Sequence, residues 1–183
     1  MYNKLFKIMI NSDKRIIFID LDSTLIKTLS GKDFALCISD MTPIWKTWNA
    51  LKEWAKIVNS GYVFIVSNQG GIEKKTGPKE NYLQAKFEFI KAALQEYLDR
   101  DCKKVLVDYT YCPYISKENY DRKPNPGMLE KMLQKYNLTS TNKNEMIMIG
   151  DASGRDINPL AFSDSDLKVA KNFNISYLDV NEL

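Results

Sequence analysis

Five short, mostly apolar runs alternate with longer stretches of helical periodicity, and this alternation restricts the fold more than any other feature. The runs lie at residues 16–19, 62–66, 104–109, 146–149 and 175–178. Each run is too short to be a buried helix, and its apolar residues are typical of a strand buried on both faces. Strands that alternate with helices form a parallel sheet with helices on both faces. The sequence therefore predicts an α/β fold, a Rossmann-like parallel sheet of about five strands.

The segments between these runs carry helix signals. Thr42 and Pro43 are residue types favoured at the N-cap and first position of a helix, and Gly61 is placed to close that helix. Further helices are expected over residues 79–99, after Asn125-Pro126, and over 164–173. The intervals left between the runs are too short for a large cap domain. At 183 residues we expect a single domain over residues 1–183.

Composition excludes several kinds of chemistry. The chain has no histidine, which removes His-based catalytic triads and most His-ligated zinc sites. Its cysteines, Cys37, Cys102 and Cys112, form no CxxC pair, so a zinc knuckle or redox motif is not indicated and a reducing compartment is expected. The net charge of +3 permits an anionic partner without requiring one.

Nothing in the sequence points to a membrane. The first seven residues are interrupted by charge before a secretory signal can form, and no apolar run is long enough to span a bilayer. We therefore expect an intracellular protein of the cytoplasm or nucleus, with no membrane partner.

Polar residues follow three of the predicted strands at the point where each strand ends. Asp20 and Asp22 follow the first run, Ser67 and Asn68 the second, and Asp151 the fourth. The carboxyl ends of parallel strands share one edge, where ligands bind in open α/β sheets. Clustered carboxylates there require a cation, and oxygen-only ligands suit Mg²⁺. The sequence therefore predicts a magnesium site.

A magnesium site of this kind favours a phosphorylated substrate, because the metal bridges enzyme and phosphoryl oxygens. Ser67 and the amides of residues 68–70 can donate hydrogen bonds to a phosphate, and Lys123 can offset the charge of the transition state. Without histidine, an aspartate must be the nucleophile, so Asp20 is expected to form an aspartyl-phosphate that water hydrolyses. Asp22 is placed to protonate the leaving oxygen and then to activate the water.

These motifs, in this order, resemble the haloacid dehalogenase (HAD) superfamily of phosphotransferases. The residues concerned are Asp20-Leu-Asp-Ser-Thr-Leu25, Ser67-Asn68, Lys123-Pro124 and Gly150-Asp151. More narrowly, the chain resembles the 3′-phosphatase domain of polynucleotide kinase 3′-phosphatases over about residues 15–178. That narrower resemblance adds the segments Thr28-Leu-Ser-Gly-Lys-Asp-Phe34, Arg122-Lys-Pro-Asn-Pro-Gly-Met128 and Gly150-Asp-Ala-Ser-Gly-Arg155.

The resemblance implies a role for each matching residue. Asp20 corresponds to the nucleophile and Asp22 to the general acid and base. The magnesium ligands correspond to Asp20, the backbone carbonyl of Asp22, and Asp151. Asp156 and Asp166 both fit a supporting acidic position, and the choice between them is open. Phosphate-binding positions are matched by Thr24, Ser67, Asn68, Lys123 and Arg155.

The substrate is inferred from the expected openness of the site. A site without a large cap admits bulky phosphorylated ends, which favours nucleic acid 3′-phosphate ends, DNA above all, and a role in DNA repair. Basic and aromatic residues beside the motifs can track phosphates and stack bases, or can simply be solvated loop residues. They are Lys74, Lys75, Lys79, Tyr114, Lys117, Tyr120 and Arg122. No Gly-x4-Gly-Lys-[Ser/Thr] loop is present, so no kinase activity is expected.

Two other functions remain open. One is a small-molecule phosphomonoesterase of the histidinol-phosphate or sugar-phosphate type on the same fold. The related histidinol-phosphate and heptose-bisphosphate phosphatases carry a Cys/His zinc loop before Arg-Lys-Pro, whereas residues 112–121 here hold one cysteine and no histidine, so we expect no zinc. The other is a catalytically silent HAD scaffold, which the joint presence of the predicted site residues argues against.

Overall fold

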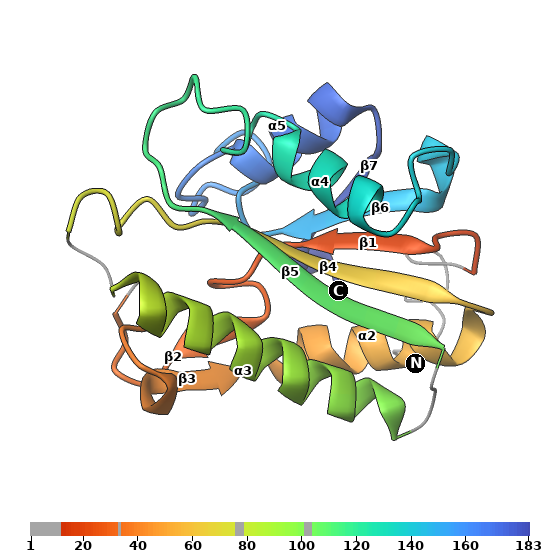
Figure 1. The fold of residues 1–183 in the computed structure, drawn as a ribbon, viewed down its shortest axis with the longest axis horizontal. Coiled ribbons are helices and arrows are strands. Elements are labelled where there is room, and N and C mark those ends of the chain that lie inside the picture. Colours follow the sequence, from red (N-terminus) through yellow and green to blue (C-terminus); the bar gives the residue numbers. More distant parts are fainter. Residues whose placement is uncertain (1–11, 33, 76–78, 101–103) are drawn as a thin grey trace.

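The computed structural model describes residues 12–32, 34–75, 79–100 and 104–183. Its centre is a five-stranded parallel sheet in the order β5-β4-β1-β6-β7 (Figure 1). The strands are β1 (Ile16–Ile19), β4 (Gly61–Asn68), β5 (Val105–Cys112), β6 (Met146–Gly150) and β7 (Ser176–Asp179). This arrangement confirms the α/β fold predicted from the alternating runs.

β1 is the middle strand, and the order of the strands reverses on its two sides. Phe18 lies between Phe64 of β4 and Met148 of β6, and all four residues of β1 are buried. Burial between two neighbours explains why this strand is a continuous apolar run. A reversal of strand order at a central strand opens a crevice at the carboxyl ends, where ligands bind in sheets of this kind.

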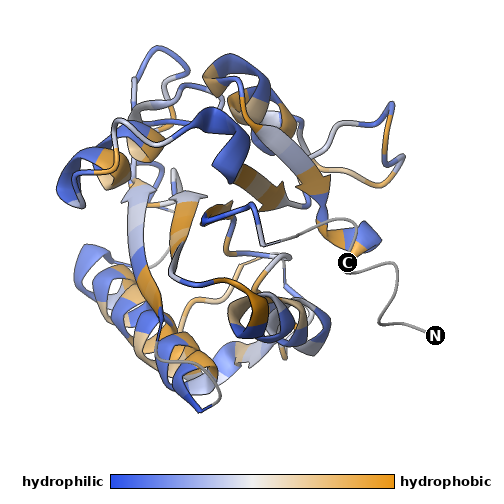
Figure 2. Cartoon of the chain, turned by 90° about the vertical axis from the view of Figure 1, so that its right-hand side faces the viewer, coloured by the Kyte–Doolittle hydropathy of each residue, from blue (hydrophilic) through white to orange (hydrophobic). Residues whose placement is uncertain are grey.

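Two helices cover each face of the sheet (Figure 1). One layer holds α2 (Trp45–Ile57) and α3 (Glu80–Asp99), and the other holds α4 (Gly127–Lys135) and α5 (Ser165–Phe173). Side chains of β1 alternate between the two cores: Ile17 and Ile19 pack in the α2–α3 layer, Ile16 and Phe18 in the other. Figure 2 shows hydrophobic stretches in the strands of the sheet and helices that carry both hydrophobic and hydrophilic stretches.

The start of the first helix differs from the sequence prediction. Thr42 and Pro43 lie in β3 (Met41–Pro43), which pairs antiparallel with β2 (Ile26–Thr28), and α2 begins only at Trp45. Proline is tolerated in β3 because both strands of a two-stranded sheet are edge strands, and an edge strand does not need a backbone N–H donor at every residue. Pairing with a distant strand therefore outweighs the local helix-start signal.

The end of that helix also differs, because Gly61 does not close it. α2 ends at Ile57, and Gly61 is the first residue of β4. A Cβ at position 61 would lie 2.5 Å from the indole ring of the buried Trp54. The glycine is thus explained by close packing between helix and strand rather than by helix termination.

In the described part of the chain, the intervals between the main strands hold short elements and one long helix, α3. Between β1 and β4 lie β2, β3, a 3-10 turn (Ile38–Asp40) and α2, and between β4 and α4 lie α3 and β5.

No described helix is both long and apolar enough to cross a membrane.

Candidate active site

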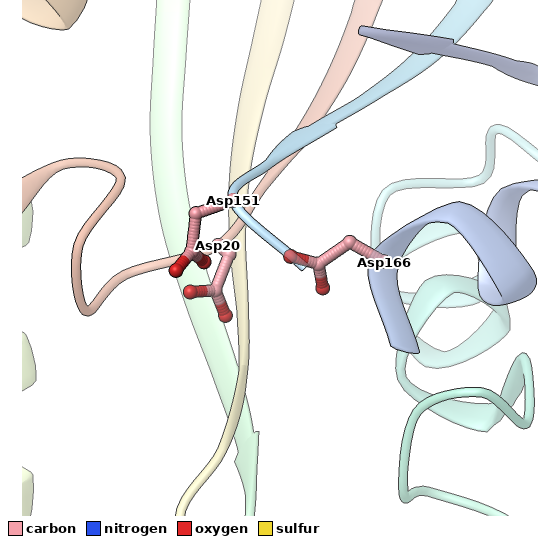
Figure 3. A group of neighbouring side chains, drawn as sticks. All are labelled: Asp20, Asp151 and Asp166. Atoms are coloured by element: carbon pink, nitrogen blue, oxygen red, sulfur yellow. The ribbon is translucent and has the colours of Figure 1, made fainter. Parts of the chain in front are cut away.

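Three aspartates meet at the carboxyl edge of the sheet (Figure 3). Asp20 directly follows β1, Asp151 directly follows β6, and Asp166 lies in the first turn of α5. Each offers a carboxylate oxygen within 4.8 Å of the others. Asp20 and Asp166 are buried, and Asp151 is partly buried. Strand order thus brings together residues that are far apart in the sequence.

The geometry distinguishes Asp166 from Asp156. Asp166 packs so closely against the end of β6 that a Cβ on Gly150 would lie 2.0 Å from its Oδ2 atom. The same oxygen accepts a hydrogen bond of 3.2 Å from the amide of Ala152. Asp156 is exposed in the loop after β6. Of the two acidic residues left open by the sequence, Asp166 is therefore the one beside Asp20 and Asp151.

Lys123 is buried in the centre of these carboxylates. Its Nζ atom lies 2.5 Å from Asp20 Oδ1 and 2.7 Å from Asp166 Oδ1, and it donates to the carbonyl of Val66 at 2.9 Å. The backbone of Lys123 is fixed by the side chain of Asn68, which donates to its carbonyl at 2.9 Å and accepts from its amide at 3.0 Å. The Asn68 side chain thus holds the lysine in place.

Asp22 has its own pair of donors. Lys86 of α3 places its Nζ atom 2.9 Å from Asp22 Oδ1, and Gln69 donates to Oδ2 at 2.7 Å. The same Gln69 amide nitrogen lies 2.9 Å from the hydroxyl of Ser67, which is buried at the end of β4. The backbone amide of Gln69 donates to Cys112, so this amide is already engaged.

Sequence reasoning missed Lys86 and the side-chain role of Gln69. Lys86 follows Leu83 by three residues and precedes Ile90 by four, so it lies on the apolar face of α3. A lysine at that position is a signal, because a solvated lysine belongs on the opposite face. The structure buries Lys86 to 3% exposure.

Of the other residues named from the sequence, Thr24 lies beside the aspartate cluster and Arg155 lies on an exposed loop. Thr24 is buried, with its hydroxyl 3.5 Å from Asp151 Oδ1. Arg155 is exposed in the loop after β6. Cys112 is a buried free thiol, Cys37 is exposed and free, and Cys102 lies outside the described residues.

Burial and mutual repulsion change the acidity of the cluster. Burial, together with the nearby Asp166 and Asp22, raises the pKa of Asp20 to about 7 despite the opposing effect of Lys123. Burial and the charge of Asp20 raise the pKa of Asp151 to about 6. Burial likewise raises the pKa of Asp166. Although burial alone would lower it, Asp166 and Asp20 raise the pKa of Lys123.

The cluster carries an excess of negative charge that suits a divalent cation. Four carboxylates (Asp20, Asp22, Asp151 and Asp166) and two buried ammonium groups (Lys86 and Lys123) leave a formal charge of −2. The atoms that Asp20, Asp151 and Asp166 offer to a cation are all carboxylate oxygens. Oxygen ligands are the ones that hard cations such as Mg²⁺ prefer. These residues therefore fit a magnesium ion.

The raised pKa values predict how stability depends on pH without metal. Between about pH 4 and 7, Asp20 and Asp151 bind more protons in the folded state than in the unfolded chain. We therefore expect the free energy of unfolding to fall as the pH rises from about 5 to about 7.5, measured by urea denaturation in EDTA. Asp20→Asn should flatten this dependence; an unchanged slope in that variant would show that other groups cause it.

The comparisons with known proteins agree with this geometry. The family model of polynucleotide kinase 3 phosphatase matches residues 15–183. The chain belongs to this family. The match covers the sheet and all of the aspartates and lysines described above, and it confirms the resemblance to HAD-like phosphatases.

Relatives of this family member include proteins of different function. The histidine biosynthesis bifunctional protein HisB of Campylobacter jejuni is 31% identical over 93% of this chain and 42% of its own length. The bifunctional polynucleotide phosphatase/kinase of Schizosaccharomyces pombe is 32% identical over 90% of this chain and 36% of its own length. The chain thus spans less than half of the length of these curated relatives.

A solved structure supports the fold independently. The D,D-heptose 1.7-bisphosphate phosphatase from B. bronchiseptica, complexed with magnesium and phosphate, superposes with a TM-score of 0.63. It is 16% identical, and the match covers 89% of this chain and 78% of that chain. At this identity the similarity concerns the arrangement of strands and helices.

Proposed function

We propose that this chain is a Mg²⁺-dependent polynucleotide 3′-phosphatase that acts on 3′-phosphate ends, with DNA favoured, in the repair of DNA ends. The observation that carries the proposal is the pairing of Asp20 with Lys123 beside Asp151. The pair lies at the edge of the sheet where the order of the strands reverses, in a member of this family. This arrangement supplies a nucleophile, a fixed positive charge and a cation site at one edge of the sheet.

In this proposal the chemistry has two steps. An oxygen of Asp20 attacks phosphorus, the bond from phosphorus to the substrate oxygen breaks, and Asp22 gives that oxygen a proton. A water molecule then attacks the phosphorus of the aspartyl-phosphate and gives its proton to Asp22. Asp20 is restored and inorganic phosphate is released.

Mg²⁺ would be held by Asp20, Asp151 and the backbone carbonyl of Asp22. When bound, it neutralises charge on the carboxylates and the phosphoryl oxygens. Lys123 contributes a second positive charge at a fixed place, because Asp166, Val66 and Asn68 restrain it. Ser67 and Thr24 are proposed phosphate ligands, and Arg155 is a further candidate on the exposed loop.

Exposed aromatic and basic side chains on the two loops that follow β4 and β5 support a substrate larger than a metabolite. The loop after β4 and the loop after β5 contact each other, since the amide of Ile115 donates to Glu73 at 2.5 Å. Tyr114 and Tyr120 on the second loop are 50% and 57% exposed. Exposed rings of this kind can stack on bases, and the exposed Lys74 and Lys75 can contact backbone phosphates.

The loop over residues 112–121 separates this proposal from a zinc-loop phosphatase. Hydrogen bonds brace it: Asn125 donates to the carbonyls of Lys117 and Asn119, and Arg122 donates to the carbonyl of Tyr114 at 2.7 Å. Cys112 is buried, and residues 112–121 hold no second cysteine and no histidine to complete a Cys/His zinc loop. The loop thus has a source of order other than a metal.

A small-molecule phosphomonoesterase remains the second candidate, because HisB proteins match 93% of this chain. The deciding experiment measures phosphate release from a nicked duplex with a 3′-phosphate, from histidinol phosphate and from p-nitrophenyl phosphate, each with Mg²⁺ or EDTA.

We expect kcat/KM for the nick to exceed that for the small esters by at least about 100-fold, since remote contacts lower the barrier only for the large substrate. Added salt should raise KM for the nick and leave the small esters nearly unchanged. Efficient release from histidinol phosphate alone would establish the metabolic alternative, and no release from any substrate would favour the silent scaffold.

A further inference from the structure

Two buried lysines pair with three of the four carboxylates of the site. Lys123 pairs with Asp20 and Asp166, whereas Lys86 pairs with Asp22. Lys86 comes from the long helix α3 on the opposite layer from Asp166 (Figure 1). Asp22 is thus engaged by a different lysine from Asp20 and Asp166.

A lysine in this position is costly for the fold. The side chains of Lys86 and Asp22 are 4% and 11% exposed, so both charges are largely removed from water. Such a pair is often less stable than apolar residues of the same volume. Lys86 also interrupts the apolar face of α3, where Leu83, Phe87 and Ile90 pack into the core. Stability alone does not explain a charge at this place.

We propose that Lys86 is a positioning residue that fixes the carboxylate of Asp22 for proton transfer to the leaving oxygen. The inference rests on the proposed function, in which Asp22 is the general acid. Lys86 and Gln69 each engage one oxygen of Asp22, so the carboxylate plane is held from two sides. Gln69 links this plane to Ser67, a proposed phosphate ligand, through the same amide nitrogen.

This role predicts a particular dependence on the leaving group. A proton from Asp22 matters most when the departing oxygen is a poor leaving group, and it matters little when that oxygen leaves readily as an anion. A misplaced Asp22 should therefore slow phenyl phosphate far more than p-nitrophenyl phosphate. A purely structural defect would slow both esters by the same factor, because it changes the amount of active enzyme.

The experiment compares kcat/KM for these two esters, since kcat/KM reports the steps up to the first irreversible one. We expect Lys86→Met to lower kcat/KM at least about 10-fold for phenyl phosphate and about twofold or less for p-nitrophenyl phosphate. The matched control is Lys91→Met on the same helix, because Lys91 pairs with Asp108 and Glu88 outside the site. That control should leave both values near those of the wild type.

A double-mutant cycle tests whether Lys86 acts through Asp22. In an Asp22→Asn background, Lys86→Met should change kcat/KM for phenyl phosphate by less than about twofold. Equal losses on both esters, or full additivity with Asp22→Asn, would overturn the inference. Lys86→Gln serves if Lys86→Met does not fold, and failure of both variants to fold would assign Lys86 to stability instead. A wild-type chain inactive on all esters would overturn the proposed function and this inference with it.

Discussion

Replacing Asp20 with asparagine is expected to abolish turnover, to below about one thousandth of the wild-type rate. The amide cannot form the aspartyl-phosphate, and the chain has no histidine that could take its place as nucleophile. The measurement is single-turnover and steady-state phosphate release from a nicked duplex with a 3′-phosphate. In the wild type, acid quenching during turnover should trap a phosphorylated chain that the variant never forms.

The same variant should keep its fold. The amide oxygen of the new side chain can still accept a hydrogen bond from Lys123, and removal of one charge relieves repulsion with Asp166 and Asp22. We therefore expect the melting temperature in EDTA at about pH 8 to stay the same or rise. Asp156→Asn is the matched control, because Asp156 is exposed in the loop after β6, and it should remain active. Near-wild-type activity of Asp20→Asn would refute the role of Asp20 as nucleophile.

The middle of the sheet was predictable because β1 and β6 are buried along their whole length. β1 and β6 are continuous apolar runs, and their bounds agree with the prediction to within one residue. β5 extends to Cys112, three residues beyond the predicted end, because residues 110–112 pair with β4. The β2–β3 pair was missed because three-residue strands lack a periodic pattern and because Thr42-Pro43 imitates the start of a helix.

Site residues could be predicted from the sequence where they lie at the ends of predicted strands. Asp20, Ser67 and Asp151 directly follow or end buried strands, so the topology alone brings them to one edge. Lys123 and Asp166 lie on no strand, so the strand pattern could not place them. Lys123 was a candidate for its charge and for the family resemblance, and the resemblance left Asp166 and Asp156 as alternatives. Lys86 was missed because helix periodicity was used to find a core and not to find a charge within it.

Among the variants proposed here, Lys123→Met should lower the free energy of unfolding the most, because it removes a buried positive charge. Lys123→Met leaves Asp20 and Asp166 buried without their shared partner, and breaking a buried ion pair typically costs about 3–5 kcal/mol. We expect a loss of that order in the free energy of unfolding, measured by urea denaturation in EDTA at about pH 8. Lys168→Met is the control, because its exposed pair with Asp164 contributes about 0–1 kcal/mol.

The sign of the pH dependence makes this prediction specific. Without Lys123, the pKa values of Asp20 and Asp166, which are already raised, should rise further, so the folded variant takes up protons as the pH falls. The deficit should therefore be largest at about pH 8 and should shrink toward about pH 5. Mg²⁺ should restore part of the stability at the higher pH by replacing the lost charge, and yet activity should stay at least about 100-fold below wild type. A variant as stable as the wild type at that pH in EDTA would show that Asp20 and Asp166 are not charged together in the folded state.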